Sequence, residues 1–198
     1  MNVQILPHPQ KPGAYRLETE LWLPRPLDHV FAFFSDPFRL EDITPPWLQF
    51  HVLTPGPVVL QAGSLLDYRL RWHGLPLRWR SEIAVWEPPV CFVDRQVIGP
   101  YRLWYHEHVF RQAGAGTRII DRVDYAVPGG ALVHWCGVRG DLQRIFEYRS
   151  RRLRELLGAA DAADGRDGGT PPDHRDQTQS GKTASGRLGN STPQHQHC

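Results

Sequence analysis

Between residues 48 and 126 the chain is a succession of strand-like segments joined by very short turns, and this pattern restricts the fold more than any other feature. Six segments are rich in Val, Ile, Leu, Tyr and Trp: residues 48–54, 64–72, 77–86, 90–98, 101–112 and 117–126. Pairs such as Pro55-Gly56, Pro88-Pro89 and Gly99-Pro100 separate them. Because such short connections cannot hold the crossover that parallel strands need, we expect an antiparallel meander.

The flanking segments predict an α+β architecture. Residues 15–23 alternate between apolar and polar side chains, which is typical of a half-buried strand and brings the expected total to seven. Two short helices are predicted next, one before Pro37 and one over residues 38–43. An apolar stripe near the end predicts one long helix within residues 131–157, about 40 Å in length. We expect the antiparallel sheet to wrap this helix.

Aromatic residues mark the domain boundaries. All 21 Trp, Tyr and Phe residues lie between Tyr15 and Tyr148, and the last 41 residues, from Gly158 on, contain none. A polar segment without aromatic residues cannot bury enough surface to order itself. We therefore predict an N-terminal extension over residues 1–14, a domain over residues 15–157 and a disordered tail over residues 158–198.

Composition excludes several classes of protein. The three cysteines form no Cys-x-x-Cys pair, which favours a reducing, cytoplasmic location. No apolar run is long enough to span a bilayer, and the N-terminus does not resemble a signal peptide. Before Gly158, 19 basic residues stand against 16 acidic ones, too small an excess for a nucleic-acid-binding protein. We expect neither nucleic acid nor membrane insertion, and the oligomeric state stays open.

Strand alternation places polar side chains on the same face as aromatic ones. The polar set is Asp94, Gln96, His106, His108 and Asp121. Buried there, each group would cost free energy unless it were paired or faced a wet cavity. Three interpretations stay open: an internal hydrogen-bond cluster, a ligand cavity, and general acid-base catalysis by a His and Asp pair. The catalytic candidates are His106, His108, Asp94 and Asp121. The predicted ligand-binding residues are Tyr68, Trp72, Trp79, Phe92, Asp94, Gln96, Trp104, His106, His108, Asp121 and Tyr125.

Other chemistries have weaker signals. His106 and His108 have a spacing that can chelate a metal, but no further Glu or His follows closely, so we expect no metal and no cofactor. No serine has a nucleophile-elbow setting, and no glycine pattern suits a phosphate. The arginines of the last helix, Arg149, Arg151, Arg152 and Arg154, could bind a partner. A solvated helix face explains them more simply.

Taken together, several motifs resemble the SRPBCC superfamily, the START-like or polyketide cyclase/dehydrase group. The opening motif is Val30-Phe31-Ala32-Phe33-Phe34-Ser35-Asp36-Pro37, followed by Leu40 and Ile43-Thr44-Pro45-Pro46-Trp47-Leu48. Later motifs are Asp67-Tyr68, Trp86-x-Pro88-Pro89, Phe92-x-Asp94-x-Gln96, Gly99-Pro100-Tyr101, Trp104-x-His106-x-His108-x-Phe110 and Asp121-x-Val123-x-Tyr125. The match covers about residues 15–157. Arg39 stands where the group has Asn, and the tail has no counterpart.

The resemblance implies a helix-grip fold, in which a curved seven-stranded sheet holds the C-terminal helix above a deep cavity. It also implies that the cavity carries or senses a hydrophobic small molecule such as a lipid, quinone or polyketide. The alternative it implies is a cyclase or dehydratase that acts on a polyketide-like substrate by His and Asp acid-base catalysis.

Overall fold

One antiparallel sheet forms the framework of the computed structural model, which describes residues 3–158. Its order is β1-β2-β8-β7-β6-β5-β4-β3, with every neighbouring pair antiparallel. The strands are β1 (Gln4–Pro7), β2 (Tyr15–Leu23), β3 (His51–Val52), β4 (Leu65–Trp72), β5 (Leu75–Glu87), β6 (Cys91–Ile98), β7 (Leu103–Ala113) and β8 (Gly116–Ala126). From β3 to β8 the chain runs as the predicted meander, and each link from β4 to β8 is too short for a crossover.

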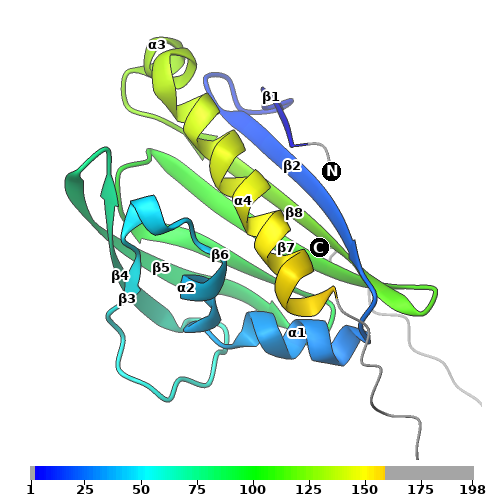
Figure 1. The fold of residues 1–198 in the computed structure, drawn as a ribbon. Helices are drawn as coiled ribbons and strands as arrows, with labels where there is room; N and C mark the ends of the chain where they lie inside the picture. The colour runs from blue at the N-terminus through cyan, green and yellow to red at the C-terminus, as the bar shows by residue number, and fades with distance from the viewer. Residues whose placement is uncertain (1–2, 159–198) are drawn as a thin grey trace, which may run out of the picture. The chain divides into compact units, whose positions relative to one another are not determined.

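The helices cover one face of this sheet. They are α1 (Leu27–Ser35), α2 (Arg39–Ile43), the 3-10 turn η1 (Pro46–Leu48), α3 (Gly130–Val133), the π-helical turn η2 (His134–Val138) and α4 (Arg139–Leu157). Figure 1 shows α4 lying diagonally across the sheet, with α1 and α2 close to its C-terminal end. The predicted α+β fold, a curved antiparallel sheet around a C-terminal helix, is confirmed.

The sheet has eight strands where seven were expected. The added strand, β1, pairs with β2 and lies in what was predicted to be an extension. Ile5 is buried in the core, and the ring of His8 lies 2.9 Å from the Asp124 carboxylate of β8. Four residues ending in Pro7 are too few to show alternation, so the sequence did not reveal this strand.

Two elements differ in detail from the prediction. The expected strand over residues 48–54 is reduced to β3, because Pro45 and Pro46 start a 3-10 turn and Gln49 takes a left-handed conformation with φ 42°. The predicted long helix is present as a continuous helical segment from Gly130 to Leu157, with the π-helical turn η2 inside it. There the extra residue of the π turn lets His134 stack on Tyr15, at 3.4 Å between ring centroids.

The core divides into two clusters on the helix-covered face. One gathers α1 side chains such as Phe31 and Phe34 against Phe92 and Phe110 of the sheet. The other gathers β2 and β8 residues against the first half of α4, including Phe146. His108 stacks on Phe92, and His106 contacts Phe146, so the two histidines lie between the clusters.

Within residues 3–158, no helix has both the length and the apolar content needed to cross a membrane. The predicted tail over residues 158–198 lies, except for Gly158, outside the described residues.

Candidate functional site

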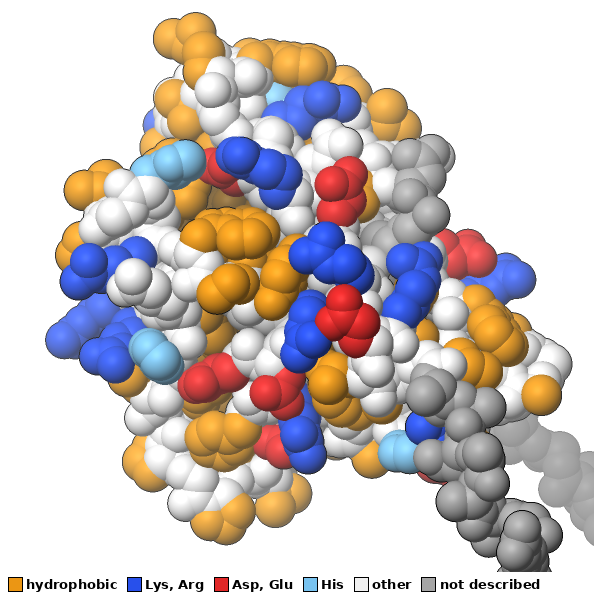
Figure 2. Space-filling view, in the orientation of Figure 1, with side chains coloured by type: hydrophobic (Ala, Val, Ile, Leu, Met, Phe, Trp, Pro, Cys, Tyr) orange, Lys and Arg blue, Asp and Glu red, His pale blue; other side chains and the backbone are white. Residues whose placement is uncertain are grey.

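A cavity of about 440 Å³ lies between the helix-covered face of the sheet and the helices α2 and α4. Its apolar wall comes from Phe33, Phe34, Leu40, Ile43, Phe50, Leu60, Leu66, Leu70, Leu77, Val127, Val138, Leu142, Ile145 and Phe146. Figure 2 shows hydrophobic side chains gathered on the surface between α4 and the β3 side of the sheet, with charged side chains along α4. The volume suits a small organic molecule.

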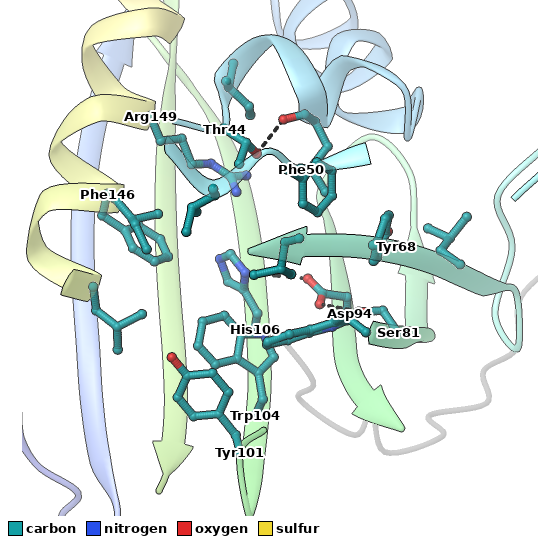
Figure 3. Close-up of a pocket in the computed structure, with 18 of the residues that line it drawn as sticks. Thr44, Phe50, Tyr68, Ser81, Asp94, Tyr101, Trp104, His106, Phe146 and Arg149 are labelled. Carbon is teal, nitrogen blue, oxygen red and sulfur yellow. Dashed lines mark hydrogen bonds and ion pairs between the residues drawn. The ribbon is translucent and has the colours of Figure 1, made fainter. Parts of the chain in front are cut away.

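Eight of the eleven predicted site residues line this cavity. They are Tyr68, Trp72, Trp79, Phe92, Asp94, Trp104, His106 and His108. Alternation accounts for this set, because residues two apart on β4, β5, β6 and β7 share the face that α4 covers. The strands position Trp104, His106 and Asp94 around one end of the cavity (Figure 3).

Three predicted residues lie elsewhere, and each has a structural partner. The Gln96 amide donates to the carbonyl of Tyr101 at 2.8 Å and accepts from its backbone N–H, which fixes the turn between β6 and β7. Asp121 lies behind the two histidines and contacts both. The Tyr125 hydroxyl lies 3.3 Å from Nδ1 of His134, in the core near Tyr15. A position on the helix-covered face of the sheet is therefore not enough to bring a side chain into the cavity.

Two histidines and two aspartates form one cluster across three strands. His106 lies between the two carboxylates, with Nδ1 3.5 Å from Asp94 and Nε2 3.2 Å from Asp121. His108 also lies between the two carboxylates, but with its ring nitrogens exchanged: Nε2 is 3.3 Å from Asp94 and Nδ1 is 2.6 Å from Asp121. The short His108–Asp121 approach lacks the alignment of a hydrogen bond. All four ring nitrogens thus lie beside carboxylate oxygens.

The pKa values of the two histidines shift in opposite directions. Burial, together with the charge of His108, lowers the pKa of His106 to about 4, despite its contacts with both aspartates. Burial also opposes the charge on His108, but Asp121 and Asp94 outweigh it and raise the pKa of His108. When the cluster binds one proton, His108 therefore holds it and His106 stays neutral.

Both carboxylates stay ionised. Burial alone would raise the pKa of Asp94, but the hydrogen bond from His108 and the positive charges around it hold that pKa below its usual value. The same balance, with Arg149 as the strongest favourable charge, holds the pKa of Asp121 well below its usual range. Asp121 is sealed, at 6% side-chain exposure, whereas Asp94 is 20% exposed. Asp94 is thus the carboxylate that a ligand can reach.

A short hydrogen-bond chain orients Asp94 at the cavity wall. Nε1 of Trp79 donates to the Ser81 hydroxyl at 2.9 Å, and that hydroxyl donates to Asp94 at 3.3 Å. The sequence alternation placed Ser81 on this face but did not single it out. Its role depends on the register that sets Ser81 of β5 opposite Gln96, two residues beyond Asp94 on β6.

Arg149 was predicted to belong to a solvated helix face, and the structure corrects this. Its side chain extends from α4 into the cavity (Figure 3). The guanidinium lies 5.5 Å from the centre of the Phe34 ring. The signal that could have revealed it is the position of Arg149 within the apolar stripe of the helix, because a charge on that stripe must face inward.

A metal ion has one plausible donor set in the described part of the chain. Asp94, His106 and His108 each offer a ligand atom, and the three atoms lie within 4.8 Å of one another. A cation there would have to displace the proton of His108 and approach the charge of Arg149, and both effects oppose binding. The expectation that no metal is required stays a prediction.

Comparison with known proteins gives one family and many similar folds. The profile of the family described as "Polyketide cyclase / dehydrase and lipid transport" matches residues 23–139. No curated protein matches significantly.

Solved structures share the fold at low sequence identity. Protein Ms6760 from Mycobacterium smegmatis superposes with a TM-score of 0.57 at 16% identity, covering 79% of this chain and 96% of the other. Ginseng major latex-like protein 151 from Panax ginseng gives a TM-score of 0.55 at 13% identity, covering 73% of this chain and 97% of the other. Protein CV1439 from Chromobacterium violaceum gives 0.60 at 11% identity, covering 73% and 99%. These likenesses concern the architecture alone.

Proposed function

The chain belongs to the polyketide cyclase/dehydrase and lipid transport family, and on that premise we propose that it carries or senses a hydrophobic small molecule held in the cavity beneath α4. The family supports hydrophobic ligand binding in general. The observation that carries the proposal for this chain is the cavity itself, whose wall is predominantly apolar.

Aromatic side chains give the cavity a shape suited to a flat or elongated apolar body. Trp79 and Trp104 meet edge to face at 5.2 Å, and Tyr101 packs against Trp104 at 4.8 Å. Such packing holds the rings in fixed orientations, so the space between them and α4 is preformed. A ligand that enters would bury apolar area at little cost in side-chain ordering.

The state of the histidines favours binding over catalysis. A general base needs a free nitrogen within reach of its substrate. Both nitrogens of His106 lie beside carboxylates, and its side chain is only 5% exposed. Asp94 is reachable, but its lowered pKa makes it a weak base. A cyclase or dehydratase that uses these groups is therefore the second candidate.

Native mass spectrometry of the protein purified from its own host tests the proposal. We expect a noncovalent adduct of one small molecule per chain, which organic extraction releases as an apolar compound. The matched variants are Leu77→Trp, which fills the cavity from β5, and Leu75→Trp on the same strand, whose side chain is 62% exposed and outside the cavity.

The adduct should be absent from Leu77→Trp and retained in Leu75→Trp. Release of a chemically altered product when the extracted compound is added back would favour the cyclase or dehydratase. Mass spectra that show only the unliganded polypeptide for the wild type and both variants would contradict the proposal that the protein carries a small molecule.

A further inference from the structure

Arg149 contacts the face of the Phe34 ring and acts on the two aspartates at a distance, but its guanidinium has no hydrogen-bonded or ion-paired partner among residues 3–158. Its Nε is buried and has no hydrogen-bond acceptor, and none of its nitrogens pairs with a carboxylate within residues 3–158. Two arginines of the sheet show the contrast: Arg16 donates to Asp124 at 2.7 Å, and Arg80 donates to Asp67 at 2.8 Å. An unpaired guanidinium at a cavity wall leaves several donors unused.

Two further donors line other parts of the cavity and are unused. Neither the Tyr68 hydroxyl nor the Tyr101 hydroxyl has a hydrogen-bond partner in the described part of the chain, and neither is sealed from the cavity. Burial raises the pKa of both Tyr68 and Tyr101, so both phenols keep their protons and can donate. Figure 3 shows Tyr68, Tyr101 and Arg149 around the cavity.

The carboxylates that line the cavity, by contrast, each already accept a hydrogen bond: Asp36 from the backbone N–H of Phe38, Asp94 from Ser81 and Asp141 from Trp72. Asp94 also lies beside both histidines. The Ser81 hydroxyl accepts from Trp79, and the Thr44 hydroxyl donates to the carbonyl of Leu40 at 2.6 Å. The vacant hydrogen-bonding capacity therefore consists mainly of donors, one of them charged, and the complementary ligand group is an anionic acceptor.

We propose that the cavity ligand is an organic acid, whose carboxylate pairs with Arg149 while its apolar body lies against the aromatic wall of Trp79 and Trp104. The proposal rests on the proposed function and specifies the ligand class. The planar guanidinium can present two parallel N–H donors to the two oxygens of a carboxylate, a geometry that lysine cannot reproduce. The Tyr68 and Tyr101 hydroxyls remain available to other oxygens of the ligand.

A competition experiment with matched probes tests this inference. The neutral fluorophore N-phenylnaphthylamine serves as the cavity probe, and the competitors are naphthylacetic acid, its methyl ester and naphthylethanol, which share one apolar body. For the wild-type chain we expect the acid to compete at least about tenfold better than the ester or the alcohol, as a charge-assisted pair warrants.

The variants separate the guanidinium from the rest of the site. Arg149→Met should remove the preference for the acid while leaving ester binding within about twofold, and Arg149→Lys should keep part of it. Arg154→Met, an exposed position on the same helix, should behave as the wild type. If Arg149→Met no longer binds the fluorophore, the competition between acid and ester is measured in Arg149→Lys instead, because that variant keeps the positive charge. A reduced preference for the acid in Arg149→Lys then supports the inference, and an unchanged preference contradicts it.

Equal competition by acid and ester in the wild type, or an acid preference that survives Arg149→Met, would overturn the inference while the proposed function stood. Failure of the fluorophore and of all three competitors to bind the wild type would instead overturn the proposed function.

Discussion

His106 and His108 are two positions apart on one strand, and yet their pKa values move in opposite directions. Both rings are buried between Asp94 and Asp121, so burial penalises a charge on either. The two carboxylates support one protonated imidazole, and its charge then lowers the pKa of the other. The cluster thus behaves as one unit, and its protonation links stability to pH.

The acid side of the stability profile should depend on His106. A pKa lowered to about 4 means that the unfolded chain binds a proton that the folded chain resists, so stability falls as pH drops from about 6.5 towards 4. We expect a loss on the order of 3 kcal/mol over this interval. Urea unfolding at a series of pH values measures it, and His106→Gln should flatten the profile. An unchanged profile in the variant would contradict this assignment.

The alkaline side should depend on His108. Its raised pKa adds stability that is complete below the unfolded value and is lost as pH rises through the folded value. In the same urea series, His108→Gln should remove this decline above pH of about 6.5. A variant whose stability declines there as steeply as the wild type would show that another group is responsible.

The charges around the cluster also predict its metal content. Because Arg149 and the proton on His108 oppose a cation, the purified protein should hold far less than one equivalent of zinc, iron or nickel. Elemental analysis of the wild type and of His106→Ala measures this. A stoichiometric metal that His106→Ala loses would reverse the electrostatic argument and favour an enzyme.

At the scale of single residues, strand alternation predicted most of the residues that line the cavity, but it did not predict which neighbouring residues lie outside it or which ones a helix adds. Asp94, His106 and His108 reach the cavity because neighbouring strands keep the register that their spacing implied. Gln96 does not, because a turn between strands captures its amide, and Arg149 was missed because it arrives from a helix distant in sequence. The capture of the Gln96 amide depends on tertiary packing, which no local period encodes, whereas the place of Arg149 within the apolar stripe of α4 was a signal present in the sequence.

Among the elements, the sheet was more predictable than its edges. Long alternating strands such as β2, β7 and β8 follow from period-2 patterns. The edge strands β1 and β3 hold four and two residues, and no such pattern can be recognised over so few. The π turn η2 was also not predicted, because it depends on the stacking of His134 on Tyr15, a contact between residues far apart in the sequence.

His8, the residue that follows β1, should contribute measurably to stability. The ring of His8 is buried, lies 2.9 Å from Asp124 and accepts two backbone N–H groups, those of Gln10 and Lys11, at 3.0 Å. Replacing it with alanine leaves these partners unsatisfied, so we expect His8→Ala to lower the free energy of unfolding by about 1 to 3 kcal/mol. His29→Ala, on the exposed side of α1, is the control and should cost less than about 0.5 kcal/mol. Equal effects of the two changes would show that His8 does not anchor β1.

For the molecule as a whole, the sheet and α4 enclose a cavity that their side chains leave open. Two hydrophobic clusters stabilise the fold on either side of the His and Asp cluster, and the cavity opens beside it. Stability therefore does not require the cavity to be filled by side chains. This separation of folding from binding leaves room for a ligand.

Titration with N-phenylnaphthylamine, followed by its fluorescence, tests the binding claim most directly. The account predicts saturable binding of one fluorophore per chain to the wild type and to Leu75→Trp, and its loss in Leu77→Trp, whose new indole occupies the cavity. Circular dichroism confirms that each variant is folded. Binding to a folded Leu77→Trp that equals the wild type, or no saturable binding to the wild type, would contradict it.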